Sequence, residues 1–67
     1  MQIHFNESQI QTQESANLLQ LLVQQQLADK HGIAVAVNNE VIPRSKWHEY
    51  ILQPEEKIVV FTAAQGG

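Results

Sequence analysis

The sequence predicts one α+β domain, in which a single main helix packs on one face of a mixed sheet of four to five short strands. Only residues 17–27 show the three- and four-residue spacing of apolar residues that is typical of a helix. The other apolar runs are short and either alternate with polar residues or are rich in valine and isoleucine. With 67 residues and no cysteine, the chain can form only a small core, which packing alone must hold together.

The N-terminal segment predicts a β-hairpin. Residues 2–6 alternate between polar and apolar side chains, which places Ile3 and Phe5 on one face of a strand. Residues 6–8, Asn-Glu-Ser, have turn chemistry, and residues 9–12 alternate again. We therefore expect two antiparallel strands joined by this turn.

The helix is expected to begin after Asn17 and to end before Gly32. Leu18, Leu21 and Leu22 form its buried stripe, which Leu19, Val23 and Leu27 broaden. Asn17 followed three residues later by Gln20 has the pattern of a capping box. Gly32 suits the left-handed conformation that ends a helix, and Lys30 and His31 would lie near the negative end of its dipole.

The second half of the chain predicts three further strands. Residues 33–37 alternate large residues with alanines, Asn38 and Asn39 suit a tight turn, and Val41 and Ile42 return antiparallel until Pro43. Residues 45–52 are expected to form one or two turns of helix, with Ser45 as the cap. After a turn at residues 54–57, the last strand runs from Ile58 to about Ala63. The resulting order, ββαββ followed by a final β, is that of a β-grasp architecture.

The last strand is apolar on both faces, although one helix can cover only one face of a sheet. Ile58 and Val60 share the face that we expect to point inward, while Val59, Phe61 and Ala63 share the other. The sequence therefore predicts an exposed apolar patch that serves as a partner-binding site.

Composition and motifs argue against several classes of function. A net charge of −3 with four basic residues disfavours nucleic-acid binding, whereas the mild acidity fits either simple solubility or steering to a basic docking surface. His4, His31 and His48 lack metal-site spacing, and the chain has neither a nucleophile motif nor a glycine-rich phosphate loop. No signal peptide or membrane-spanning stretch is evident. We expect a cytoplasmic protein that is not an enzyme and binds neither a metal nor a cofactor.

Three residues after the fourth strand have both structural and binding interpretations. Pro43 would end that strand, and Trp47 would pack against the sheet edge beside Ile51. Arg44 is expected either to cap a helix carbonyl, to pair with Glu40, or to contact a partner.

The sequence ends on Gly66-Gly67, which alone would be read as a fraying end or an expression scar. Together with the segment Ile42-Pro43-Arg44-x-x-Trp47, however, this ending resembles the ThiS family of sulfur carriers of thiamine biosynthesis, and the resemblance extends over essentially the whole chain. It implies a ubiquitin-like β-grasp domain over residues 1–63 and a flexible tail over residues 64–67.

The resemblance also implies a chemistry for the tail. Gly67 would be adenylated at the expense of ATP by the enzyme ThiF, converted to a thiocarboxylate with sulfur from a cysteine desulfurase, and used by the thiazole synthase ThiG. Gln65 and Gly66 would thread into these enzymes, because glycine lacks the Cβ that crowds a narrow channel. Val59, Phe61, Ala63 and Arg44 are then the candidate partner-binding residues. Two alternatives are open: another β-grasp carrier, of the molybdopterin or the ubiquitin-modifier type, and a plain protein-interaction module.

Overall fold

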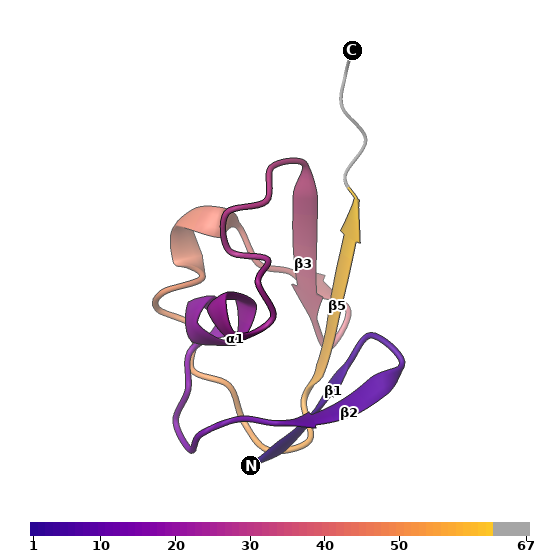
Figure 1. Cartoon of the computed structure of the whole chain (residues 1–67), viewed down its shortest axis with the longest axis vertical. Coiled ribbons are helices and arrows are strands. Elements are labelled where there is room, and N and C mark those ends of the chain that lie inside the picture. Colours follow the sequence, from indigo (N-terminus) through magenta and orange to yellow (C-terminus); the bar gives the residue numbers. More distant parts are fainter. Residues whose placement is uncertain (63–67) are drawn as a thin grey trace.

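A computed structural model describes residues 1–62 of the chain, and residues 63–67 lie outside the described part. One helix, α1, lies against one face of a five-stranded sheet whose strand order is β2-β1-β5-β3-β4 (Figure 1). The elements are β1 (Gln2–Phe5), β2 (Ser8–Gln11), α1 (Leu18–Gln24), β3 (Ile33–Val37), β4 (Glu40–Val41), the 3-10 helix η1 (Arg44–Lys46) and β5 (Lys57–Thr62). The mixed α+β architecture predicted from the sequence is confirmed.

The last strand in the sequence, β5, is the central strand of the sheet. It runs parallel to β1, pairing Phe5 with Ile58, and antiparallel to β3, pairing Val37 with Ile58 and Ile33 with Thr62. The hairpin β1–β2 and the hairpin β3–β4 are both antiparallel and form the two outer parts of the sheet. Strand β5 therefore joins the two hairpins into one sheet.

The core lies between α1 and the inner face of the sheet. Leu18, Leu21 and Leu22 of the helix are fully buried, as their spacing predicted. They belong to one cluster with Ile3, Phe5, Val35, Val37, Trp47, Leu52 and Ile58. Removing a buried aliphatic side chain of this kind costs about 2–5 kcal/mol, so this small cluster accounts for much of the stability of the domain.

The start of α1 matches its sequence signal. The backbone N–H of Gln20 donates to Asn17 Oδ1 at 2.7 Å, and the backbone N–H of Asn17 donates to Gln20 Oε1 at 2.8 Å. These two bonds form the predicted capping box and satisfy two amides at the helix terminus.

The expected helix end at Gly32 is wrong, because α1 ends at Gln24. Gln26 adopts a positive φ of 63°, and the N–H groups of Gln26 and Leu27 donate to the carbonyls of Val23 and Leu22. This is a Schellman motif with glutamine at the position that glycine usually occupies. Leu27, expected within the helix, instead packs on the core from the segment after it.

The turns follow the polar residues expected there, with small shifts in the strand boundaries. Strand β2 begins at Ser8 instead of Gln9 and ends at Gln11. The intervening turn is Asn6-Glu7, with Asn6 at φ 54°. Asn38 and Asn39, at φ 51° and 72°, connect β3 to β4, which spans Glu40–Val41 instead of the expected residues 41–42.

The segment expected to be a helix over residues 45–52 contains only η1, and the proposed cap at Ser45 is wrong. The residue that precedes this short helix is Pro43, and no side chain caps it. The chain then makes backbone bonds to the start of α1: Leu18 N–H donates to Tyr50 O at 2.8 Å, and Leu52 N–H donates to Ala16 O at 2.9 Å. Because these tertiary bonds take the backbone groups, a longer helix cannot form here.

Candidate functional site

The face of the sheet opposite α1 carries the candidate binding surface. Residues paired across antiparallel strands share a face, so Phe61 lies beside Ala34, and Val59 lies beside Ala36. Ala36 is also paired with Val41 on the other side. We call the five residues Ala34, Ala36, Val41, Val59 and Phe61 the outer patch.

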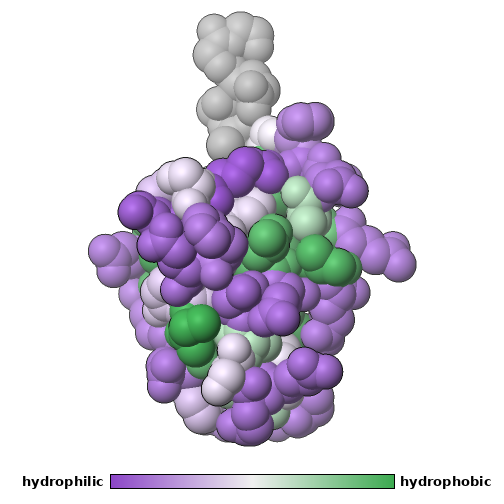
Figure 2. Space-filling model, turned by 90° about the vertical axis from the view of Figure 1, so that its left-hand side faces the viewer, coloured by the Kyte–Doolittle hydropathy of each residue, from purple (hydrophilic) through white to green (hydrophobic). Residues whose placement is uncertain are grey.

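The exposure of the outer patch supports the faces assigned from the sequence. Phe61 is 42% exposed and Val41 58% exposed, whereas Ile58 is fully buried and Val60 packs on the core. Val59 is half-buried. On the opposite side of the molecule, formed largely by α1 and η1, polar residues predominate and hydrophobic residues reach the surface in separate areas (Figure 2). The outer patch is thus an apolar surface formed by β3, β4 and β5.

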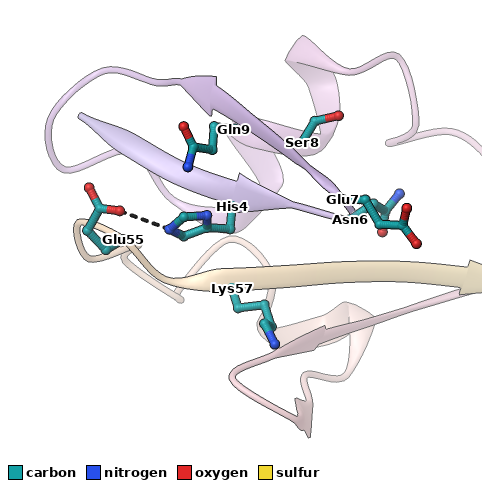
Figure 3. Close-up of a pocket in the computed structure, with 7 residues that line it drawn as sticks. All are labelled: His4, Asn6, Glu7, Ser8, Gln9, Glu55 and Lys57. Carbon is teal, nitrogen blue, oxygen red and sulfur yellow. Dashed lines mark hydrogen bonds and ion pairs between the residues drawn. The ribbon is translucent and has the colours of Figure 1, made fainter.

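The outer face becomes polar toward the beginning of β5. His4 is paired with Lys57, and together with the hairpin tip and Glu55 they line a hollow of about 380 Å³ (Figure 3). His4 Nε2 lies 2.9 Å from Glu55 Oε1, while the ammonium group of Lys57 points away from this pair (Figure 3). Because the hollow is shallow and holds charges of both signs, it lacks the enclosed apolar walls of a typical small-molecule site.

Arg44 and Trp47 hold the segment after α1 in place. The guanidinium of Arg44 donates to Lys30 O at 2.7 Å and to Ala28 O at 3.1 Å, and its Cζ lies 4.4 Å from the centre of the Trp47 ring. Of the alternatives left open by the sequence, it neither caps a carbonyl of α1 nor pairs with Glu40, because Ala28 and Lys30 both follow the helix. Arg44 therefore has a clear structural role, although its side chain remains exposed.

Trp47 is more deeply placed than packing on a sheet edge requires. It is 2% exposed, belongs to the core cluster, and donates through Nε1 to Ile42 O at 2.9 Å. Ile51, expected beside it, is 47% exposed. The tryptophan is thus a core residue, with its polar atom satisfied by the backbone.

Glu56 joins the two turns at the base of the sheet. Its carboxylate accepts hydrogen bonds from Tyr50 Oη at 2.8 Å and from Asn38 Nδ2 at 3.2 Å. Burial, together with the hydrogen bond and the negative charge of Glu56, raises the pKa of Tyr50 to about 12. These contacts tie the loop before β5 to the turn between β3 and β4.

Three further expectations concern metal binding, membrane-spanning helices and the last residues of the chain. Within residues 1–62, no cluster of three or more histidine, aspartate or glutamate side chains is arranged to hold a metal ion. No helix in this part of the chain is long and apolar enough to cross a membrane. Ala63, Gln65, Gly66 and Gly67 lie outside the described residues, so their expected roles stay predictions.

Sequence reasoning missed three residues of the outer patch and one contact beside it. Ala34, Ala36 and Val41 complete the patch, and the alternation of the two alanines with Ile33, Val35 and Val37 could have indicated their role. Asn6 accepts a hydrogen bond from the backbone N–H of Val60 at 2.9 Å through its Oδ1. Residues 6 and 60 are far apart in the sequence, and no local pattern marks their contact.

The strand order and the single helix on one face of the sheet define a β-grasp protein. The sequence model of the ThiS family matches residues 1–67, and the chain belongs to this family. It is 34% identical over 68 residues to the sulfur carrier protein ThiS of Escherichia coli strain K12, with all of both chains covered.

Two solved structures share the fold. The crystal structure of the thiamine biosynthesis protein ThiS from Geobacter metallireducens matches with a TM-score of 0.86 at 22% identity, with both chains fully covered. A solution structure of a thiamine biosynthesis protein from the same organism matches with a TM-score of 0.75 at 23% identity and covers all of this chain and 88% of the other. At these identities, the two structures support the β-grasp fold.

Proposed function

We propose that this protein is a sulfur carrier of thiamine biosynthesis, which carries sulfur as a thiocarboxylate on Gly67. The observation that carries this proposal is the match of the ThiS family over residues 1–67. The similarity to a curated sulfur carrier over its full length supports it. The protein is then a co-substrate of other enzymes and has no catalytic site of its own.

The proposed chemistry proceeds in two steps at the Gly67 carboxylate. A carboxylate is a poor electrophile, so its oxygen first attacks the α-phosphorus of ATP and displaces pyrophosphate, which forms an acyl-adenylate. A cysteine desulfurase supplies the sulfur as a persulfide, which an external thiol reduces by two electrons to sulfide. The sulfide then attacks the acyl carbon, displaces AMP and leaves the thiocarboxylate. The ATP-using enzyme is of the ThiF type, the sulfur derives from a cysteine desulfurase, and the acceptor enzyme is a ThiG-type thiazole synthase. All three partners and the carrier would meet in the cytoplasm.

The outer patch is the proposed docking surface for these enzymes. Phe61 is a large exposed aromatic residue, and such residues often dominate the binding free energy of protein interfaces. Val59 lies two residues earlier on the same strand face. Ala63, Gln65 and Gly66 would extend this contact into the partner. Of the four proposed partner-binding residues, Arg44 has the weakest support, because its guanidinium already contacts two carbonyls and a ring.

Intact-mass measurement tests the proposal directly. The purified chain is incubated with ATP, a ThiF-type adenylyltransferase, a cysteine desulfurase, cysteine and a thiol reductant that converts the persulfide sulfur to sulfide. The expected product is heavier than the starting chain by the difference between one sulfur and one oxygen atom. A variant that lacks Gly67 is the matched control and should stay unmodified while remaining folded. An unmodified wild-type chain would contradict the proposal and favour a plain interaction module, and attachment to another protein would indicate a ubiquitin-like modifier.

A further inference from the structure

The central strand β5 has one open edge near its C-terminal end. On the side toward β1, the two strands are paired only at His4 with Lys57 and at Phe5 with Ile58. After Phe5 the chain turns away at Asn6-Glu7 into β2. On the other side, β3 stays paired with β5 as far as Thr62 (Figure 1). The last part of β5 therefore has a neighbouring strand on one side only.

The hydrogen bonds show which backbone groups point toward this open edge. His4 N–H donates to Glu56 O, and Asn6 N–H donates to Ile58 O, so even-numbered residues of this segment direct their backbone groups toward β1. The odd-numbered Lys57 directs its own toward β3, because its carbonyl accepts from Asn38 N–H. By the alternation of an antiparallel ladder, Phe61 bonds to Ala34, whereas Val60 and Thr62 face the open side.

Only one of these outward groups has a described partner. Val60 N–H donates to Asn6 Oδ1 at 2.9 Å, so a side chain accepts the hydrogen bond that a neighbouring strand would otherwise accept. Among residues 1–62, neither Val60 C=O nor Thr62 N–H has a hydrogen-bond partner on this side. Next to them, Asn6, Glu7, Ser8 and Val59 line a hollow of about 510 Å³. The surface thus offers both unpaired strand groups and space beside them.

We propose that an extended segment of the partner enzyme adds to this edge as a short extra strand alongside Val60–Thr62. One residue of a segment parallel to β5 can donate to Val60 C=O and accept from Thr62 N–H at the same time. Such a segment would lie on the same side of β5 as β1, beyond the point where β1 ends. Main-chain pairing of this kind provides affinity through the backbone, while side-chain contacts provide specificity. The adjacent Val59 and Phe61 of the outer patch supply such contacts.

The choice of a partner enzyme as occupant rests on the proposed function. The open edge leads directly into residues 63–67, which must enter the enzyme if Gly67 is to react. The enzyme must then surround the chain immediately after Thr62, which brings enzyme segments within reach of the open edge. A second copy of this chain is the competing occupant, since exposed edges also pair with one another.

Hydrogen–deuterium exchange resolved by NMR tests the inference in the full chain. The probe is a ThiF-type adenylyltransferase, added to isotope-labelled carrier. The Thr62 amide should exchange rapidly in the free chain and at least about tenfold more slowly in the complex. The Phe61 amide, which bonds to β3, should be protected in both states and serves as the internal control.

A pair of variants adds a second measurement. Thr62→Pro removes the outward N–H without removing a bond to β3, and loss of one hydrogen bond should weaken binding by about threefold to tenfold. Thr62→Val keeps the N–H and should bind like the wild type. If Thr62→Pro fails to fold, exchange at Thr62 in the wild-type complex decides the question.

The outcomes separate this inference from the proposed function. A complex in which Thr62 remains unprotected overturns the strand addition alone and leaves the carrier role standing. Absence of any binding overturns the carrier role and this inference with it. Protection of Thr62 in the free chain that rises with its concentration would assign the edge to a second copy and overturn the enzyme as occupant.

Discussion

At the scale of single residues, Asn6 determines where the pairing of β1 with β5 ends. It adopts a positive φ of 54°, which asparagine tolerates better than most residues. Its N–H donates to Ile58 O, and its Oδ1 accepts from Val60 N–H. The backbone of Asn6 therefore forms the hairpin turn, and its side chain satisfies a backbone N–H of the central strand.

We expect Asn6→Ala to lower the free energy of unfolding by about 1–2 kcal/mol. The change removes a hydrogen bond worth about 1 kcal/mol and places a Cβ without a polar group in the left-handed region. Asn6→Asp keeps an acceptor and should lose less. Urea denaturation followed by circular dichroism measures both variants, and an alanine variant as stable as the aspartate variant would contradict the role given to Oδ1.

Tyr50 makes the stability of the fold depend on pH in the alkaline range. Its pKa is raised from 10.0 to about 12, chiefly by burial and then by the hydrogen bond to Glu56. The folded state thus favours the neutral phenol. Its stabilising contribution is fully present below pH 10.0 and is lost as the pH rises through about 12.

The free energy of unfolding should therefore fall between pH 10 and 12, and Tyr50→Phe should show a shallower fall, because phenylalanine cannot ionise. The comparison with Tyr50→Phe isolates the contribution of the tyrosine from that of every other ionisable group. Tyr50 is the sole tyrosine of the chain, and its ultraviolet absorbance reports its titration directly. Equal slopes for the two proteins would show that the phenol has no such linkage.

At the scale of elements, the residue that follows the C-cap of α1 has a backbone conformation that glycine would adopt at lower cost. Gln26 occupies the left-handed position of the Schellman motif at φ 63°. A residue with a Cβ is costlier there than glycine, while the adjacent Gln25 has an ordinary φ of −89°. The helix stops at this point because Leu27 turns back onto the core.

We expect Gln26→Gly to raise the free energy of unfolding by about 0.5–1 kcal/mol, since glycine relieves the left-handed conformation at a small entropic cost. For a domain of this size, about 1 kcal/mol corresponds to an increase of roughly 4–8 °C in Tm. Gln25→Gly is the matched control and should not stabilise the protein. Thermal unfolding of both variants provides the measurement, and an unchanged or lower Tm for Gln26→Gly would refute this account of the helix end.

At the scale of the whole molecule, the single helix leaves the sheet with two unlike faces. The inner face is buried under α1, and the outer patch is left uncovered within the described residues, with Phe61 42% exposed. Because Phe61 contributes little to the core, its apolar area is available for binding. The stability of the fold and the affinity for partners thus depend on different side chains of one strand.

Phe61→Ala should weaken binding to a ThiF-type adenylyltransferase by about thirtyfold, which corresponds to about 2 kcal/mol of buried apolar surface. Its Tm should change little. Val23, which is 60% exposed on α1, offers a matched control, because Val23→Ala removes a hydrophobic side chain from the opposite side of the molecule. Calorimetric titration measures both variants. Unfolding of the Phe61→Ala protein at room temperature would place Phe61 in the core, and equal losses for both variants would remove the outer patch from the interface.

Much of the fold could be predicted because its signals are local. Alternation over two residues assigned the faces of β1 and β5, and the spacing of Leu18, Leu21 and Leu22 assigned the buried face of α1. The capping box from Asn17 to Gln20 lies within one helical turn, so its two partners are visible in sequence. Gly66-Gly67 and the Pro43-Arg44 segment led to the ThiS family in the same way, as short patterns of residue types.

By itself, the sequence determined the class of fold, the start of the helix and which residues of the last strand face outward, since each follows from residues within a few positions of one another. The tertiary structure alone decided that α1 ends at Gln24, with Leu27 turning back onto the core soon after, and that Arg44 donates hydrogen bonds to the carbonyls of Ala28 and Lys30. It also decided that Asn6 Oδ1 accepts a hydrogen bond from Val60 N–H, whereas β1 does not extend far enough to pair with Thr62. These contacts join residues that are distant in the chain, and their geometry exists only once the sheet has formed around β5.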